Sequence, residues 1–449
     1  MLTAASLSDA ASCTELYWED NTAMENIKRK AIVGAVGIAI ASGVIKLLMT
    51  TLAIFQNTFC ELHGYSPTQF SVALSIVSAG GIIAGMFIGK LVSSVGIKKL
   101  TMAASFAPII AMAGLRYCDS ILAAYAVVLV CGVLVGLATP AVMNMYIGSW
   151  FNKGKGTMVS VAQTISSVWQ ILFVPAATAF MVKAGPERSP LIVGCMMSVI
   201  ALTGSMLMKE MPAKYGVQPV DLVEKKKKTG KAAAEEVYNV QMPANKLVTR
   251  LPAFGALVMI FLSIIAMVML ATYGVYIYNS YVGDMVVSSY YVSIATAVSM
   301  ATALLFGILC DKIGVRKSIV LYGTLFVVSR FLGPIIGGKA GALIMAIFNG
   351  MQTFTTMYIG IGYPLIVGYK NMASFAGWAG ALMSCGGVVG PILAMALVGA
   401  ADGSYDLVVY VSGILILAAT ILCVVCISPK SRAVIRTADE QWIAENAHA

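Results

Sequence analysis

Long apolar segments separated by short polar loops run along most of the sequence. About 20 apolar residues suffice to cross the ~30 Å hydrocarbon core of a bilayer as a helix. Twelve segments qualify: 31–56, 68–89, 100–116, 120–145, 157–182, 189–208, 251–278, 286–309, 318–337, 340–366, 371–398 and 405–427. Only 11% of the 449 residues are charged, against roughly 25% in a globular protein. The sequence therefore predicts an all-α membrane protein with twelve transmembrane helices.

Lysine and arginine are distributed unequally between the two sides of the predicted membrane. An even number of spans places both termini on one side, and that side carries 24 of the 30 basic residues. Because basic residues concentrate in cytoplasmic loops, we expect both termini to be cytoplasmic and the protein to lie in the cell (inner) membrane. The same asymmetry explains the formal net charge of +10 without a nucleic-acid partner.

The longest polar loop divides the spans six and six. We expect a cytoplasmic tail at 1–30, a six-helix bundle at 31–209, a basic cytoplasmic linker at 210–250, a second six-helix bundle at 251–427 and a cytoplasmic tail at 428–449. The first 27 residues contain no apolar core of a signal peptide, so the first span should serve as its own insertion signal. The run Lys225–Lys228 is interpreted as solvated linker, with contact to anionic lipid as the alternative.

A short motif occurs at equivalent places in the two halves. The motif occupies residues 89–99 after the second span and residues 307–317 after the eighth, an offset of 218 residues. Each copy begins with a glycine, and a second glycine and basic residues follow. Small residues precede both copies at every fourth position: Gly81, Gly85 and Gly89, and at the same offset Ser299, Ala303 and Gly307. Small residues on one helical face allow close helix packing. The shared offset predicts two pseudo-symmetric six-helix bundles.

The second copy, G-x-L-x-D-x-x-G-x-R-K, resembles the cytoplasmic-loop signature of the major facilitator superfamily. The resemblance covers the whole chain and implies the major facilitator fold, with a cavity near the bilayer midplane that opens alternately to each side. It also implies residues that latch a conformation rather than touch substrate: Gly89, Gly96, Asp311, Gly314 and Arg316. Ser93 replaces the acid in the first copy, which implies a weaker latch there. A merely tight, charged turn is the alternative.

A narrower resemblance follows the fourth span. Trp150-Phe151 and Gly156 are similar to the W-F-x-x-x-x-G turn of oxalate/formate antiporters and monocarboxylate transporters. Aromatic and basic residues at a membrane interface are the alternative explanation. Oxalate/formate antiporters carry basic residues in spans eight and eleven, but 286–309 and 371–398 contain none, and the acidic–basic pair of monocarboxylate transporters is missing from span eight. These departures leave the substrate open.

Two basic residues lie inside predicted spans. Lys46 lies about fifteen residues into the first span, and Arg330 lies in the ninth. A charge in a span costs about 2.5–3.5 kcal/mol on insertion scales, and no Asp or Glu lies well inside any span. The pair therefore predicts an anionic substrate, and the monocarboxylate-transporter resemblance implies a functional lysine near Lys46. Snorkelling is the alternative for Lys46, and snorkelling or a structural pair for Arg330, since span nine usually packs outside the cavity in this superfamily.

Neutral polar residues complete the predicted site. Gln163, Ser166, Ser167 and Gln170 share one helical face in span five, which is either a cavity wall or a hydrogen-bonded helix seam. Tyr273 and Tyr276 are interpreted as part of an aromatic belt or as a gate. Superfamily geometry alone adds lining residues in spans ten and eleven, namely Gln352, Tyr358, Tyr363 and Trp378. The predicted substrate-binding set is Lys46, Tyr273, Tyr276, Gln163, Gln170, Asn144, Gln352, Tyr358, Trp378 and Arg330.

The remaining sequence features argue against catalysis. The two histidines, His63 and His448, lie outside the spans, and no P-loop, HExxH or GxSxG motif occurs. We therefore expect no enzyme, no metal and no cofactor, but a monomeric secondary transporter, antiporter or symporter, for a small organic anion such as a mono- or dicarboxylate. An exporter of amphipathic or drug-like compounds is the alternative, although such antiporters usually rely on a membrane-embedded acid. A non-transporting membrane receptor is a remote alternative.

Overall fold

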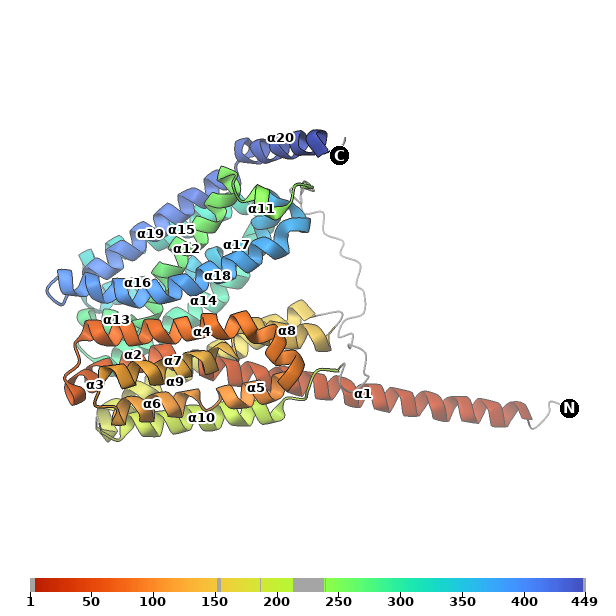
Figure 1. The fold of residues 1–449 in the computed structure, drawn as a ribbon, viewed down its shortest axis with the longest axis horizontal. Helices are drawn as coiled ribbons and strands as arrows, with labels where there is room; N and C mark the ends of the chain where they lie inside the picture. Colours follow the sequence, from red (N-terminus) through yellow and green to blue (C-terminus); the bar gives the residue numbers. More distant parts are fainter. Residues whose placement is uncertain (1–4, 152–154, 186, 213–237, 239, 447–449) are drawn as a thin grey trace.

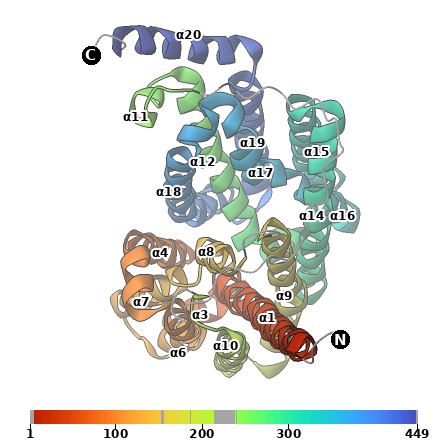
Figure 2. The ribbon, with the colours of Figure 1, turned by 90° about the vertical axis from the view of Figure 1, so that its right-hand side faces the viewer.

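The structure is a computed structural model that describes residues 5–151, 155–185, 187–212, 238 and 240–446. Most of the predicted linker, including Lys225–Lys228, lies outside the described residues, as do His448 and residues 152–154 of the Trp-Phe turn. The chain forms two helical bundles, one from each half of the sequence, which lie side by side in Figures 1 and 2.

The N-terminal bundle contains the first six spans, several of them built from more than one helix. Its helices are α1 (Ala5–Lys46), α2 (Leu48–Ile54), α3 (Gln56–His63), α4 (Pro67–Val95), α5 (Ile97–Ala104), α6 (Ala107–Tyr117), α7 (Ile121–Gly136), α8 (Pro140–Trp150), α9 (Lys155–Ala184) and α10 (Ser189–Leu207). Helix α1 begins well before the first predicted span and projects beyond the bundle (Figure 1). Part of the predicted tail therefore continues the helix of the first span.

The C-terminal bundle contains the other six spans and two helices near the linker and the C-terminus. Its helices are α11 (Ala244–Leu247), α12 (Leu251–Thr272), α13 (Gly274–Val282), α14 (Met285–Ile313), α15 (Val315–Ile336), α16 (Gly338–Asn349), the 3₁₀ helix η2 (Gly350–Thr353), α17 (Phe354–Ile361), α18 (Tyr363–Ala400), α19 (Asp406–Cys426) and α20 (Pro429–Asn446).

Within the described residues, ten helical stretches are long and apolar enough to cross a membrane. The other two predicted spans are interrupted. Span four divides into α7 and α8, and span ten passes from α16 through η2 to α17. The predicted twelve-helix membrane fold is thereby confirmed.

The internal repeat extends from the motif to the helix ends. Helices α4 and α14 begin and end at positions related by the same offset of 218 residues. Each has a side-chain cap: Ser66 accepts from the Gln69 amide at 3.1 Å, and Asp284 accepts from two first-turn amides at 2.8 and 3.0 Å. Both helices end at a glycine with positive φ, Gly96 at 95° and Gly314 at 87°.

Spans one and seven also break at equivalent positions. Phe55 separates α2 from α3, and Tyr273, 218 residues later, separates α12 from α13. Span one has a further break directly after Lys46, where the Leu47 amide donates to the Val44 carbonyl at 3.1 Å. This bond is one residue shorter than the α-helical pattern, so the helix tightens beside Lys46.

Hydrogen bonds join the two bundles in the half of the membrane domain away from the termini, here called the far side. The Tyr276 hydroxyl donates to the Ile54 carbonyl at 2.9 Å. The Ser293 hydroxyl donates to the Ile171 carbonyl at 2.7 Å. Helix α4 packs against α18 and α9 against α14 along the same interface (Figure 2). The structure is therefore closed between the halves on the far side.

Candidate functional site

A cavity of about 1000 Å³ lies between the two bundles. In the N-terminal half its wall comes mainly from α9 and from the region where α1 passes into α2. In the C-terminal half it comes from α12 to α16, η2 and α17. Because both halves contribute, a molecule in this cavity would touch the two parts that move against each other in alternating access.

Of the described residues in the N-terminal half, Lys46 is the cation that lines the cavity. Its side chain is accessible at the cavity wall, while the residues before and after it, Ile45 and Leu47, are buried. The local break between α1 and α2 places Lys46 at the very end of α1. No hydrogen bond or ion pair to Lys46 is found among the described residues. Its ammonium group therefore faces the cavity with its charge uncompensated.

Arg330 is the cationic residue that the C-terminal half contributes. Its side chain is 1% exposed and lines the cavity from α15, so it does not snorkel to the headgroups. Its Nη2 donates to Asn349 Oδ1 at 2.6 Å and to the Met345 carbonyl at 3.3 Å. The guanidinium lies 4.5 Å from the centre of the Phe326 ring, a cation–π arrangement. Arg330 is thus both a structural partner of span ten and part of the cavity wall.

Neutral amides and hydroxyls form the remaining polar surface. Gln163, Ser167 and Gln170 line the cavity from α9. Ser166, on the same face in the sequence, donates to the Ala39 carbonyl in α1 at 3.1 Å. The predicted polar face therefore serves both purposes, as cavity wall and as helix seam. Gln352 lines the opposite wall, and its Oε1 is buried without a hydrogen-bond partner among the residues that the structure describes.

The charged side chains found in the described part of the cavity wall are both positive. Among the described lining residues, Lys46 and Arg330 are the charged ones, and none is Asp or Glu. An uncompensated charge in a membrane domain is expensive and marks a functional site. An anion in the cavity would supply the missing counter-charge.

Two predicted tyrosines lie outside the cavity wall. Tyr273 is fully buried at the break between α12 and α13, and its hydroxyl has no partner among the described residues. Tyr276 bonds to Ile54 and stacks on Tyr405, with ring centres 6.2 Å apart. The break in span seven instead turns Tyr278 toward the cavity. Tyr276 lies where the halves meet on the far side, which fits the gate interpretation.

Three other predicted residues are also absent from the wall. Tyr358 is 1% exposed and packs edge-on against Tyr363. Trp378 packs against Phe375, with ring centres 5.0 Å apart. Asn144 is exposed on α8, which does not contribute to the cavity. Tyr358 lies six residues after Gln352, and six residues turn a helix by about 240°, so the two side chains face in different directions.

Tyr278 and Asn349 were not among the predicted site residues. Asn349 ends α16 and accepts from Arg330, and the Tyr278 hydroxyl lies beside the same guanidinium. Asn349 could have been found from the sequence, because it is a lone asparagine within an apolar span. Tyr278 could not be separated from its neighbouring tyrosines without knowing how span seven breaks.

The described residues of the repeated motif are not among those that line the cavity, and their conformational role stays a prediction. Gly96 and Gly314 form the turns after α4 and α14, and Arg316 is exposed at the start of α15. Asp311 and Gly89 lie in the last turns of α14 and α4. The buried Glu210 lies against Gly96: a Cβ built on Gly96 would be 2.6 Å from its Oε2. This contact supplies an acid near the first copy, where Ser93 replaces the motif acid.

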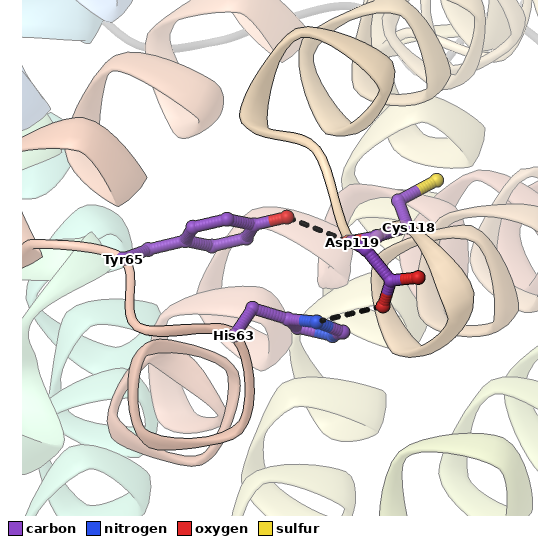
Figure 3. Close-up of polar contacts among 4 residues, drawn as sticks. All are labelled: His63, Tyr65, Cys118 and Asp119. Atoms are coloured by element: carbon purple, nitrogen blue, oxygen red, sulfur yellow. Dashed lines mark hydrogen bonds and ion pairs between the residues drawn. The ribbon is translucent and has the colours of Figure 1, made fainter.

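A separate polar cluster joins two far-side loops (Figure 3). The Tyr65 hydroxyl donates to the Cys118 carbonyl at 2.6 Å, and His63 Nδ1 lies 3.7 Å from Asp119 Oδ1. The His63 and Tyr65 rings stack with centres 5.3 Å apart. These contacts tie the loop after α3 to the loop before α7 and do not reach the cavity. Across the described residues, no group of three or more His, Cys, Asp and Glu side chains is arranged to hold a metal ion.

Comparisons with known proteins agree with this architecture. The E. coli xylose transporter XylE, in a partially occluded inward-open conformation, matches with a TM-score of 0.62 and 12% identity, over 88% of this chain and 97% of that one. A D-xylose–proton symporter matches with a TM-score of 0.59 and 16% identity, over 88% and 96%. The nucleoside transporter NupG matches with a TM-score of 0.65 and 12% identity, over 87% and 98%. At these identities the likeness concerns the fold.

The family comparison covers most of the chain. No curated protein matches it, and the resemblance to oxalate/formate antiporters and monocarboxylate transporters stays a prediction. Residues 32–369, well over half of the sequence, match the family described as Major Facilitator Superfamily. The chain therefore belongs to the Major Facilitator Superfamily and is a membrane transporter rather than an enzyme.

Proposed function

We propose that this protein is a secondary active transporter that moves a small organic anion, a mono- or dicarboxylate, by alternating access. The observation that carries the proposal is Lys46, an accessible cation at the cavity wall without an acidic partner among the described residues. Without substrate its charge has no counter-charge in the described cavity wall, and a carboxylate would supply one. Substrate binding would thus favour states in which the cavity closes around the ion pair.

The proposal includes an orientation and a site. The concentration of Lys and Arg on the terminal side supports cytoplasmic termini in an inner membrane, so closure on the far side corresponds to an inward-facing state of a monomer. Lys46 would hold the carboxylate. Gln163, Gln170 and Gln352 would hydrogen-bond the rest of the molecule.

A neutral polar solute is the second candidate, because amides and hydroxyls are more numerous in the cavity wall than charges. The structures of similar fold include transporters of xylose and of nucleosides. Such a substrate would leave both cations without a counter-charge, so we favour an anionic substrate. Export of amphipathic compounds would suit the many apolar residues of the wall but gives no role to the two unpaired cations, so it enters as an outcome of the test.

The test is thermal unfolding of the purified protein with carboxylates, amino acids, sugars, nucleosides and amphipathic drugs. A ligand at 100 times its Kd should stabilise the native state by about 2.7 kcal/mol. We expect a carboxylate to give this shift, Lys46→Gln to lose it, and Lys46→Arg to keep part of it. Lys99→Gln is the matched control, because Lys99 is exposed on α5, outside the cavity.

Two outcomes would contradict the proposal. A carboxylate shift that survives in Lys46→Gln would remove Lys46 from the site. A shift with sugars, nucleosides or amphipathic cations only would replace the anion by that class of substrate.

A further inference from the structure

The two cavity cations belong to opposite halves of the protein. Lys46 ends α1 in the N-terminal bundle, and Arg330 lies in α15 of the C-terminal bundle. Both line the same cavity of about 1000 Å³. The 218-residue offset of the internal repeat does not relate the two positions. The two cations are therefore not equivalent residues of the repeat.

Arg330 is held in a built pocket rather than placed on a loose surface. Asn349 and the Met345 carbonyl accept from its Nη2, and the Phe326 ring lies beside its guanidinium. A Cβ added at Gly413 of α19 would come within 3.0 Å of the Arg330 Cβ, so α19 packs closely against the base of the side chain. The position of the guanidinium is therefore fixed before any ligand arrives.

The contacts of Arg330 leave its charge and one of its donors unused. Its partners are an amide oxygen, a carbonyl, an aromatic ring and the Tyr278 phenol, all neutral groups. The side chain is only 1% exposed, and its Nε has no hydrogen-bond partner among the described residues. A guanidinium remains protonated in proteins, and a buried unpaired donor destabilises the structure. A carboxylate in the cavity, whose wall Arg330 joins, would supply the missing counter-charge.

A single carboxylate would neutralise one cation and leave the other without a counter-charge. The described cavity wall contributes two positive charges and no negative one, and a buried charge needs a partner. We propose that the substrate is a dicarboxylate, with one carboxylate bound by Lys46 and the other by Arg330. This step rests on the proposed function and narrows its substrate class. A dicarboxylate held in this way bridges the bundles, so its presence would tie the movement of one half to the other.

The competing explanation is that Arg330 only braces α15 against α16 through Asn349. In that case its loss would weaken all ligands alike or destabilise the protein without ligand. Binding through a second carboxylate has a different signature, because only the ligand that carries this carboxylate would lose affinity. Ligands that differ in a single charge can therefore separate the two roles.

The experiment measures Kd by titration calorimetry for butanedioate, its monoamide and its diamide, with the full-length protein in nanodiscs at neutral pH. Sulfate is included as a compact dianion. The variants are Arg330→Gln, Arg330→Lys and Lys46→Gln. We expect the wild type to prefer butanedioate over the monoamide about tenfold or more, a difference of about 1.4 kcal/mol, and to bind the diamide and sulfate more weakly still. Arg330→Gln should lose this preference and keep its affinity for the monoamide, whereas Arg330→Lys should keep most of the preference.

The results that overturn the inference are distinct from those that overturn the proposed function. If the monoamide or sulfate binds the wild type as tightly as butanedioate, and Lys46→Gln abolishes that binding, the anion transporter stands and the dicarboxylate bridge falls. The bridge also falls if Arg330→Gln weakens butanedioate and monoamide equally. If no carboxylate binds at all, the proposed function fails together with the bridge. Should Arg330→Gln not fold, the wild-type preference and Arg330→Lys still decide the question.

Discussion

Two glycines at equivalent turns differ in their surroundings, although their backbones are alike. Gly96 (φ 95°, ψ 145°) and Gly314 (φ 87°, ψ 153°) both adopt a conformation that is open almost only to glycine, and a side chain there costs about 1–3 kcal/mol. A Cβ at Gly314 would meet nothing within 4 Å, whereas one at Gly96 would lie 2.6 Å from the buried Glu210 carboxylate.

This difference predicts unequal effects of the same substitution. Gly314→Ala should lower the free energy of unfolding by the backbone penalty of about 1–3 kcal/mol, and Gly96→Ala should lower it further because Glu210 must also move. The midpoint of thermal unfolding in detergent measures both. Glu210→Ala, combined with Gly96→Ala, should remove the excess. Equal losses of unfolding free energy in the two single variants would mean that the Glu210 side chain can move away at no cost in stability.

The predicted charged residues line the cavity, whereas the predicted aromatic ones do not. Lys46 and Arg330 could be found because a charge within an apolar span is rare and needs a partner, and both line the cavity. Tyr273 and Tyr276 could not be assigned in this way. An aromatic side chain suits the core, the interface and a binding site equally, so only the rotation of its helix decides where it points. That rotation depends on the break at Tyr273.

At the scale of helices, α20 holds the end of the linker against the membrane domain. Asp439 is fully buried and accepts from the amides of Gln241 at 2.9 Å and Met242 at 2.7 Å. Asn371 of α18 donates to the Met242 carbonyl at 3.0 Å. Burial, followed by its hydrogen bond with Asp439, raises the pKa of the Tyr238 phenol, so this group stays protonated and can donate to the carboxylate.

We expect Asp439→Asn to release this segment locally. A hydrogen bond to a charged acceptor is worth about 1.5–3 kcal/mol, and an asparagine can accept through only one of its two side-chain atoms. Hydrogen exchange at the Gln241 and Met242 amides should accelerate. Glu440→Gln, an exposed neighbour on the same helix, should leave the exchange unchanged. Unaltered exchange in Asp439→Asn would show that the apolar contacts of α20, such as those of Ile435, hold the segment.

Most helices of the fold could be predicted from the sequence, because hydropathy and the 218-residue offset are strong signals. The ends of α4 and α14 follow that offset, and their caps, Ser66 and Asp284, are common helix-starting residues. The interior breaks could not be predicted. Phe55 has no glycine or proline beside it, and the one glycine beside Tyr273, Gly274, does not by itself indicate a break within an apolar span.

At the scale of the whole molecule, the observed state is held by contacts on the far side. The Tyr276–Ile54 bond crosses between halves. A tyrosine with the same kind of bond lies within one half: the Tyr322 hydroxyl donates to the Thr302 carbonyl at 2.8 Å. Both side chains are nearly buried, so the two tyrosines form a matched pair for testing closure.

We expect Tyr276→Phe to shift the population toward a state that is open on the far side. Loss of one net hydrogen bond of about 1 kcal/mol corresponds to roughly a fivefold change in the equilibrium between states. Spin labels at Glu187→Cys and Lys339→Cys, exposed on the far side of each half, would report a larger fraction of long distances. Tyr322→Phe should leave the distance distribution unchanged. A similar shift in both variants would reflect general loosening instead of a gate.

The proposed transport of an organic anion between these two states is tested most directly by counterflow in proteoliposomes. Vesicles are loaded with unlabelled butanedioate, and labelled butanedioate is added outside. We predict transient accumulation of label by the wild type and by Lys99→Gln, and none by Lys46→Gln. Accumulation of labelled xylose or a nucleoside in vesicles loaded with the same unlabelled solute, with no accumulation of any carboxylate tested, would contradict anion transport.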